Sequence, residues 1–393
     1  EHRGRVLTGR PVNSSLLSKW LRNLSDKLQS TEHLVLTSAH VQDSLRRSHE
    51  TTPGPDWVPH GAYKVLGDYA ASFLYDVAED MQEYGAENKV PANFNHAILC
   101  CLQKTASRTG AVHGDVYAPS KTRPLSIVNT DNRIIANAYR LMMEPIIGMW
   151  VSDMQRGFLN GRSMLSNVVD VDVEAMKISL KHPHGAIVQF DFASACPSLS
   201  QEYMLKVLSH IGLPEGILKA IQQMYANNLH FVKLKGSIFP SFTSTSGVRQ
   251  GCPLSPFLFA VIADLLLRRF NDSLPQSLTR AFADDTAVMI PDFHSYAQPI
   301  MAIFCEFASI SNLHLNIDKT VLIPLWESSE PSIRRWLQDD FPNWAGVEIT
   351  WAACYLGFFV GPRRTFQTRV TAWSALHLGL EQPHTQDILL VSA

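Results

Sequence analysis

The sequence predicts an α+β protein in which antiparallel strands lie beside helices. Segments with helical apolar spacing alternate with short strands, and several strand pairs have the pattern of hairpins, which favours antiparallel pairing over a doubly wound parallel sheet. Hydrophobic residues make up 46% of the 393 residues, enough for a sizeable core. Charged residues make up only 18%, which excludes a disordered or coiled-coil protein.

The N-terminal third predicts few strong elements. Residues 1–50 are polar and are expected to form a poorly defined extension, with one short helical pattern at 16–28. Turn-forming residues at 53–56 predict a loop. Residues 61–84 then repeat apolar side chains at helical spacing up to Gly85, which predicts a single helix.

The rest of the chain predicts further helices and strands. Apolar helical spacing covers residues 131–147 with Thr130 as N-cap, 201–228 with a break near 212–214, 255–270 with Ser255 as N-cap, and 299–312. Strand patterns cover residues 186–192, a hairpin at 231–246 around Gly236, two short strands within 280–290, and one strand within 313–324.

The charge distribution limits the class of protein. A net charge of −2 excludes a protein that coats nucleic acid or membrane with its whole surface. Residues 101–165 nevertheless hold eight Lys or Arg against four Asp or Glu, a local excess of +4, which indicates a basic groove or simply a solvated face.

Other global features concern the setting of the protein. Six cysteines without a Cys-x-x-Cys pair predict reduced thiols, which are typical of an intracellular protein. No charge-free apolar run reaches the roughly 18 residues that cross a bilayer, so no membrane contact is expected. The chain starts with Glu and has no signal-peptide pattern, so we expect a piece of a longer protein.

Three carboxylates are candidates for a cation site. Asp284 and Asp285 fall in the turn between the two strands of 280–290, and Asp191 ends the buried strand 186–192. If these strands are neighbours, the three acids converge, and clustered carboxylate oxygens suit Mg²⁺. The alternatives are ordinary turn-forming aspartates and a strand-end cap.

A loop at 247–256 is the next candidate. It holds two glycines and two prolines before a helix, so its backbone is well defined. Gly251 allows close approach to a ligand, and the Gln250 amide can hydrogen-bond a sugar or a base edge. The alternative is a simple helix-entry loop.

In their order and spacing these motifs resemble a reverse transcriptase of the non-LTR (LINE-type) retrotransposon class and, more distantly, group II intron reverse transcriptases. The resemblance runs over about residues 53–361. Its motifs are Pro53-Gly54-Pro55-Asp56, Arg123-Pro124-Leu125-Ser126-Ile127, the Gly-Phe and Gly-Arg-Ser segment at 155–163, the palm strand at 190–199, Gln250-Gly251, Phe282-Ala283-Asp284-Asp285, residues 315–320, and Tyr355-Leu356-Gly357.

The resemblance implies a right-hand polymerase fold with fingers and palm, the palm being an antiparallel sheet backed by helices, and with a thumb that is truncated or absent. The helix that follows Pro256 is expected to pack beneath the sheet. The implied parts are the N-terminal extension 1–50, fingers with connecting helices 51–180, the palm 181–345, a primer-grip-like hairpin 346–362, and a residual thumb start or disordered tail 363–393.

The resemblance also implies RNA-directed DNA polymerase activity, in which a primer 3′-hydroxyl is extended with dNTPs. Two Mg²⁺ ions, with Mn²⁺ as an alternative, are expected on Asp191, Asp284, Asp285 and the backbone carbonyl of Phe192. Lys319 is the implied general acid for the leaving pyrophosphate, with an ordinary surface lysine as the alternative.

Further residues receive nucleotide roles from the resemblance. Arg123, assisted by Lys121, is expected at the triphosphate, and Gln250 and Gly251 beside the sugar. Cys196 stands where relatives carry an aromatic ring that excludes a 2′-hydroxyl, so we hypothesise weaker sugar discrimination.

Nucleic-acid partners follow in the same way. An RNA template and a DNA primer or target are the implied partners, and the implied setting is the nucleus or a ribonucleoprotein particle. Arg156 and Arg162 are expected to contact template phosphates, and Tyr355, Leu356 and Gly357 to contact the primer.

Three other readings remain open. About thirty residues follow the Tyr355-Leu356-Gly357 hairpin, fewer than the thumb of the family needs, so a catalytically inactive nucleic-acid-binding remnant is an alternative. A maturase-like RNA-binding protein is another. The last is an unrelated α+β protein whose turn happens to carry two aspartates.

Overall fold

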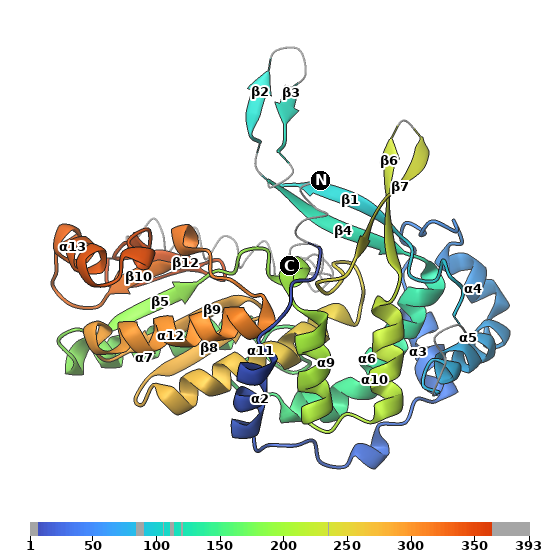
Figure 1. Cartoon of the computed structure of the whole chain (residues 1–393), viewed down its shortest axis with the longest axis horizontal. Helices are drawn as coiled ribbons and strands as arrows, with labels where there is room; N and C mark the ends of the chain where they lie inside the picture. Colours follow the sequence, from blue (N-terminus) through green and yellow to red (C-terminus); the bar gives the residue numbers. More distant parts are fainter. Residues whose placement is uncertain are drawn as a thin grey trace. The chain divides into compact units, whose positions relative to one another are not determined.

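The computed structural model describes residues 7–83, 90–104, 106–110, 114–118, 121–234 and 236–363. The chain forms two compact units (Figure 1). The first unit comprises Glu1–Trp150, Cys196–Ile262 and Ile310–Asn312, and the second comprises Val151–Ala195, Ala263–Ser309 and Leu313–Ala393. The predicted residual thumb falls almost wholly on residues 364–393, which lie outside the described residues.

The first unit is a four-stranded sheet with helices. The sheet order is β4-β1-β6-β7, and all neighbours are antiparallel except the parallel pair β1 and β6. The strands are β1 Ala97–Gln103, β4 Thr122–Val128, β6 Asn228–Leu234 and β7 Ser237–Ser244, with a small hairpin of β2 Arg108–Gly110 and β3 Gly114–Val116. The helices are α2 Ser14–Asn23, α3 Ser38–Arg47, α4 His60–Leu66, α5 Asp68–Asp80, α6 Thr130–Trp150, α8 Ala195–Ser198, α9 Gln201–His210 and α10 Glu215–Tyr225.

Several predictions for the first unit are confirmed and others are wrong, including Ser255, which is the first residue of α11 (Ser255–Ser273) rather than its N-cap. The hairpin around Gly236 and the break between α9 and α10 are as predicted. The single helix predicted over 61–84 is two helices, because Gly67 breaks it with a φ of 52° that side chains rarely adopt. Thr130 is the first residue of α6 rather than its N-cap, and its hydroxyl donates to the Val58 carbonyl at 2.6 Å.

The N-terminal extension holds more structure than its composition suggests. The predicted helix at 16–28 exists as α2 and buries Leu17 and Trp20. The sequence does not predict α3, because Val41 and Leu45 are its only buried apolar residues and leave little periodicity. The hydroxyl of Ser44 on α3 donates to the Ile134 carbonyl of α6 at 2.8 Å, which joins the extension to the helices of the same unit.

The second unit is a five-stranded sheet in the order β11-β10-β5-β9-β8. Its strands are β5 Ala186–Phe190, β8 Leu278–Phe282, β9 Asp285–Ile290, β10 Val321–Pro324 and β11 Glu348–Ile349, and a separate hairpin pairs β12 Ala353–Tyr355 with β13 Phe358–Val360. Every neighbouring pair is antiparallel except β10 and β11. The predicted α+β class with antiparallel pairing is therefore confirmed.

Helices pack on both faces of this second sheet. Helix α7 Met164–Lys181 buries Val171 and Ala175 against Ile187 and Met289 of the sheet. The other face receives α11 Ser255–Ser273 and α12 Phe293–Ser311, and the shorter α13 Glu330–Asp340 follows β10 in the chain. The Phe190 ring lies 6.3 Å from Phe270 of α11 and 4.6 Å from Phe304 of α12, so the helix after Pro256 packs beneath the sheet as predicted.

No helix in the described part of the chain combines the length and apolarity needed to cross a membrane.

Candidate active site

The second unit brings two of the predicted carboxylates to one cavity. Strands β5 and β9 are neighbours, with Phe190 opposite Thr286, so Asp191 and Asp285 emerge at the same end of adjacent strands. A cavity of about 170 Å³ is lined by Gln189, Phe190, Asp191, Asp285, Thr286, Lys319, Val321, Cys354, Tyr355 and Leu356. The strand register alone therefore places the two acids together.

The electrostatics of the cavity are dominated by Asp285. The pKa of its carboxyl is raised to about 7, first by desolvation and then by the charges of Asp284 and Asp191, while the charge of Lys319 acts in the opposite direction. Like-charged groups close enough to act on one another indicate a site that a cation would stabilise.

Lys319 supplies the counter-charge in the described structure. It ends a short 3-10 helix, Ile317–Lys319, and its Nζ lies 3.3 Å from Asp191 Oδ2. The segment is fixed to the strand end, since the Asn316 N–H donates to the Asp191 carbonyl at 2.8 Å. The Lys319 side chain is 64% exposed, so it keeps access to a ligand in the cavity.

The predicted carboxylate oxygens are chemically suited to a hard divalent cation, but only two of the three carboxylates lie in the cavity. Carboxylate oxygens are the ligands that Mg²⁺ prefers. Asp191 and Asp285 line the cavity, whereas Asp284, which directly precedes Asp285 in the sequence, is outside that lining. Across the described residues no group of three or more His, Cys, Asp or Glu side chains is arranged to hold a metal ion.

The hairpin of β12 and β13 forms another part of the cavity. Tyr355 and Leu356 line it, and the buried Tyr355 hydroxyl donates to the Arg280 carbonyl at 3.3 Å. Gly357 completes the turn with a φ of 84°. Cys354 and Gln189 also line the cavity and were not predicted. Strand alternation could have found Gln189, because it lies two residues before Asp191 and thus on the same face.

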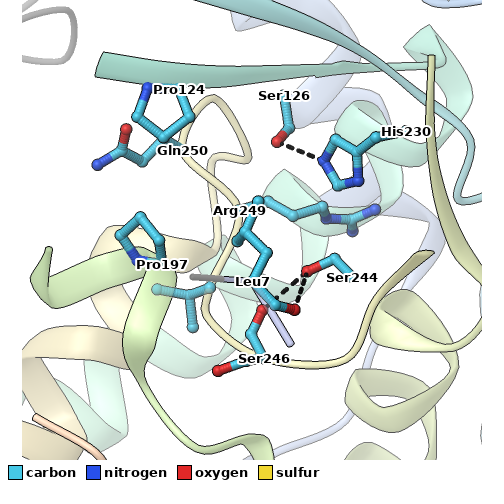
Figure 2. Close-up of a pocket in the computed structure, with 10 residues that line it drawn as sticks. Leu7, Pro124, Ser126, Pro197, His230, Ser244, Ser246, Arg249 and Gln250 are labelled. Atoms are coloured by element: carbon cyan, nitrogen blue, oxygen red, sulfur yellow. Dashed lines mark hydrogen bonds between the residues drawn. The ribbon is translucent and has the colours of Figure 1, made fainter. Parts of the chain in front are cut away.

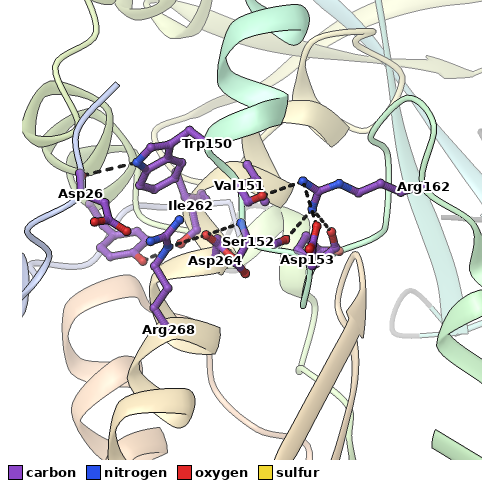
Figure 3. A network of polar contacts seen from close by, with 11 residues as sticks. Asp26, Trp150, Val151, Ser152, Asp153, Arg162, Ile262, Asp264 and Arg268 are labelled. Atoms are coloured by element: carbon purple, nitrogen blue, oxygen red, sulfur yellow. Dashed lines mark hydrogen bonds and ion pairs between the residues drawn. The ribbon is translucent and has the colours of Figure 1, made fainter. Parts of the chain in front are cut away.

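Arg156 and Arg162, the two arginines predicted to contact the template, both bond to groups of this chain. Arg156 pairs with Asp170 at 2.8 Å. Arg162 donates to the Gln155 carbonyl at 2.6 Å. It also donates to the carbonyls of Val151, at 2.6 Å, and Ser152 (Figure 3). Both side chains are 16% exposed, and a template phosphate would have to compete with these bonds. The phosphate contacts of the two arginines stay a prediction.

Figure 3 also shows a buried carboxylate that holds the same segment. Asp264 of α11 is fully buried, accepts from the Ser152 N–H at 3.1 Å and from the Ser152 hydroxyl, and pairs with Arg268 at 2.7 Å. Because Arg162 donates to the Ser152 carbonyl, these bonds fix the segment that leads into Gln155.

The first unit contains most of the predicted nucleotide residues. A small pocket is lined by Leu7, Pro124, Ser126, Pro197, His230, Ser244, Ser246, Val248, Arg249 and Gln250 (Figure 2). The Ser126 N–H of β4 donates to the Gln250 carbonyl at 2.8 Å. Gly251 has a φ of 104°, and a Cβ there would lie 3.0 Å from the Ser126 carbonyl oxygen, so the loop needs glycine.

The remaining nucleotide residues flank this pocket. Cys196 lies on α8, and its carbonyl accepts from the Val248 N–H at 2.8 Å. Arg123 lies on β4, and Lys121 precedes that strand with its side chain exposed. Arg249 was not predicted, although it is buried and donates to Asn95 and Asn132, both at 3.2 Å.

Curated proteins resemble this chain over much of its length. It is 22% identical over 355 residues to the "Transposon TX1 uncharacterized 149 kDa protein" of Xenopus laevis, covering 86% of this chain and 25% of that protein. It is 30% identical over 297 residues to the "Retrovirus-related Pol polyprotein from type-2 retrotransposable element R2DM" of Drosophila melanogaster, covering 72% of this chain and 26% of that protein. The chain thus spans about a quarter of the length of these relatives.

A solved structure of apo telomerase from Candida tropicalis, truncated from its C-terminal domain, is also similar. It has a TM-score of 0.47 and 12% sequence identity, and the match covers 69% of this chain and 54% of that one.

The family match completes the assignment. Residues 107–358 match the family described as "Reverse transcriptase (RNA-dependent DNA polymerase)", a span that includes both the carboxylate cavity and the Gln250 loop. The chain belongs to the reverse transcriptase family, and the curated relatives that it resembles are proteins of transposons and retrotransposable elements.

Proposed function

We propose that this chain is the fingers and palm of an RNA-directed DNA polymerase that extends a primer 3′-hydroxyl with dNTPs on an RNA template. The observation that carries this proposal is the shared cavity of Asp191 and Asp285, with Lys319 paired to Asp191 at 3.3 Å. Family membership supports the same reaction class. The predicted division into fingers 51–180, palm 181–345 and a hairpin at 346–362 belongs to this proposal.

The cation ligands of the proposal are the three acids and one backbone oxygen. Two Mg²⁺ ions, or Mn²⁺ in their place, would be held by Asp191, Asp284, Asp285 and the Phe192 carbonyl. When bound, they supply activation of the attacking hydroxyl and charge stabilisation of the leaving pyrophosphate. The raised pKa of Asp285 supports this assignment, because a cation would relieve the repulsion among the carboxylates.

The remaining residues bind and orient the substrates. Lys319 is proposed to give a proton to pyrophosphate as the phosphate bond breaks, a role that its exposed ammonium beside Asp191 allows. Arg123 and Lys121 are proposed to bind the triphosphate, and Gln250 and Gly251 the sugar. Tyr355, Leu356 and Gly357 are proposed to hold the primer end.

Primer extension tests the proposal. The full chain is incubated with an RNA template, an annealed DNA primer, dNTPs and Mg²⁺, and products are counted by length. Asp284→Asn is expected to lower extension by about a thousandfold or more, because one oxygen donor and one negative charge are lost. Asp339→Asn, which changes an exposed carboxylate on α13 of the same unit, is the matched control and is expected to extend normally.

Two results contradict this function. Binding of the primer–template without any extension by the wild-type chain indicates an inactive nucleic-acid-binding remnant. Equal activity of Asp284→Asn and the wild type shows that the reaction does not use the proposed carboxylates.

A further inference from the structure

The turn that carries Asp284 and Asp285 is fastened to a distant stretch of chain. The Ala281 N–H of β8 donates to the Met154 carbonyl at 2.8 Å, and the Arg156 N–H donates to the Ala281 carbonyl at 2.9 Å. These two bonds form a short parallel bridge between Gln155 and Ala281. The segment 154–157 therefore runs directly alongside the start of the turn.

The side chain of Gln155 continues this attachment into the turn itself. Its Oε1 accepts from the Ala283 N–H at 2.9 Å and from the Gly157 N–H at 2.9 Å, and its Nε2 donates to the Ala283 carbonyl at 3.0 Å. The Gln155 residue is fully buried, and Ala283 is 6% exposed. One amide group thus satisfies both backbone groups of Ala283, which water cannot readily reach.

Ala283 needs such support because its backbone is strained. Its φ is 59°, a left-handed conformation that costs an alanine about 1 kcal/mol or more. Ala283 directly precedes Asp284, so its conformation sets the direction in which the chain, and with it both carboxylates, enters the turn.

Gly157 permits the close approach. A Cβ at this position would lie 2.1 Å from the Ala283 nitrogen and 2.8 Å from the Phe282 carbonyl carbon. These are backbone atoms, so a side chain at 157 would push the turn away from Gln155. Gln155 and Gly157 therefore act together, one by bonding the turn and the other by leaving room for it.

We infer that Gln155 is a positioning residue of the polymerase reaction, which fixes the backbone of Ala283 and thereby the placement of the Asp284 and Asp285 carboxylates. The inference rests on the proposed function. An amide suits the position because its NH2 group donates to the Ala283 carbonyl, its oxygen accepts twice, and it is neutral. Glutamate would remove the donor and add a negative charge beside the two acids, and an apolar side chain would leave both backbone groups unpaired.

A buried amide on the neighbouring helix provides a matched control. Asn167 of α7 is fully buried, and its Nδ2 donates to the Ala281 carbonyl at 2.9 Å. It therefore bonds the same strand but not the turn residue. Gln155→Met and Asn167→Leu each replace a buried amide by an apolar side chain of similar size, so both are expected to lower the melting temperature.

The test compares these variants in the full chain by three measurements. These are the melting temperature, kcat and KM for dNTP in primer extension, and hydrogen exchange of the Ala283 amide in metal-free protein. Gln155→Met is expected to lower kcat by about 100-fold with little change in KM. Misplaced carboxylates stabilise the transition state less well, whereas substrate binding depends less on their placement. The Ala283 amide of Gln155→Met is expected to exchange about tenfold faster or more. Asn167→Leu is expected to keep kcat and the exchange rate of the Ala283 amide close to those of the wild type.

Gln155→Glu guards against failure of Gln155→Met to fold. It keeps the length and the two accepted bonds but loses the donated one and adds a negative charge beside the two acids, so its kcat is also expected to fall. A wild-type kcat in either variant overturns the inference, and so does an equal loss of kcat in Asn167→Leu. Absence of extension by the wild-type chain refutes the proposed function instead. In that case hydrogen exchange still tests whether Gln155 holds the turn. An unchanged exchange rate of the Ala283 amide in Gln155→Met refutes this role, and a faster rate supports it.

Discussion

Burial decides the behaviour of several single titratable residues in this chain. The pKa of Asp285 is raised to about 7 by partial desolvation of its carboxyl and by the charges of its neighbouring acids, although the residue keeps an exposed surface. His230 moves in the opposite direction for the same reason, with burial lowering its pKa to about 4. In each case the protein opposes the charged form of the group.

His230 is expected to make the protein less stable in mild acid. Its ring lies 2.9 Å from the Ser126 hydroxyl (Figure 2). It also stacks on Phe242, and the charge of Arg249 adds to the effect of burial on its pKa. The folded state keeps the ring neutral, whereas the unfolded state binds a proton below about pH 6.5. Stability is therefore lost as the pH falls from about 6.5 to about 4, by at most about 3 kcal/mol.

Urea unfolding at pH 7 and pH 4.5 checks this expectation. His230→Gln keeps a polar partner for Ser126 but cannot titrate, so its stability should fall less between the two pH values than that of the wild type. Part of the dependence should remain, because His60 is buried with a similarly lowered pKa. An identical pH dependence in both proteins would show that His230 does not contribute.

Cys196 supports a prediction about sugar selection. A thiol is much smaller than the aromatic ring expected at this position, so the chain should incorporate ribonucleotides more readily than its relatives. Cys196→Phe is expected to increase the preference for dNTPs over rNTPs by about tenfold, measured as the ratio of kcat/KM values. A strict dNTP preference that is the same in the wild type and the variant would show that the hypothesis is wrong.

At the scale of elements, hairpins build the carboxylate cavity. The β8–β9 turn carries the acid pair, and the β12–β13 hairpin adds Cys354, Tyr355 and Leu356 to the lining. A turn is easily displaced, so its fixation by the segment that contains Gln155 is an element-level requirement for a defined site.

Cys354 offers a chemical probe of this arrangement. It is exposed and lines the cavity together with Asp191 and Asp285. Maleimide labelling should therefore block access and remove most of the primer extension, and Cys354→Ser should protect the chain. Cys305→Ser, which removes another exposed thiol of the second unit, should leave the chain sensitive. Labelling of Cys354, verified by mass spectrometry, with full activity retained would place the reaction elsewhere.

At the scale of the whole molecule, the positive charge that could attract nucleic acid is concentrated in one part of the sequence, residues 101–165. The net charge is only −2, and residues 101–165 hold eight cations, of which Arg133, Arg140, Arg156 and Arg162 lie on or after helix α6. The other four lie on or beside the strands β1, β2 and β4 of the first unit: Lys104, Arg108, Lys121 and Arg123. A backbone hydrogen bond joins two of these residues, since the Lys104 N–H donates to the Lys121 carbonyl at 3.1 Å.

Salt titration tests whether these cations bind phosphates. The double variant Lys104→Gln with Arg108→Gln should weaken binding to an RNA–DNA primer–template and reduce the slope of log K against log salt by about 2. Lys206→Gln changes an exposed lysine that pairs with Glu202 in the same unit, and it should leave the slope unchanged. A slope unaffected by the double variant would assign the phosphate contacts to other residues.

The sequence alone determined the fold class, most of the helices and strands, and the family, because apolar periodicity, turn residues and ordered motifs are local properties of the chain. The break at Gly67 and helix α3 escaped prediction, since a backbone angle and two apolar residues leave little pattern. Only the tertiary structure decided which side chains meet. Strand register brought Asp191 to Asp285, and the bond from the Asn316 N–H to the Asp191 carbonyl brought Lys319 to the same place. Arg156 and Arg162 bond to other groups of this chain. The bonds from Gln155 to Ala283 join residues 128 positions apart, and such pairings depend on how the whole chain packs rather than on neighbouring residues.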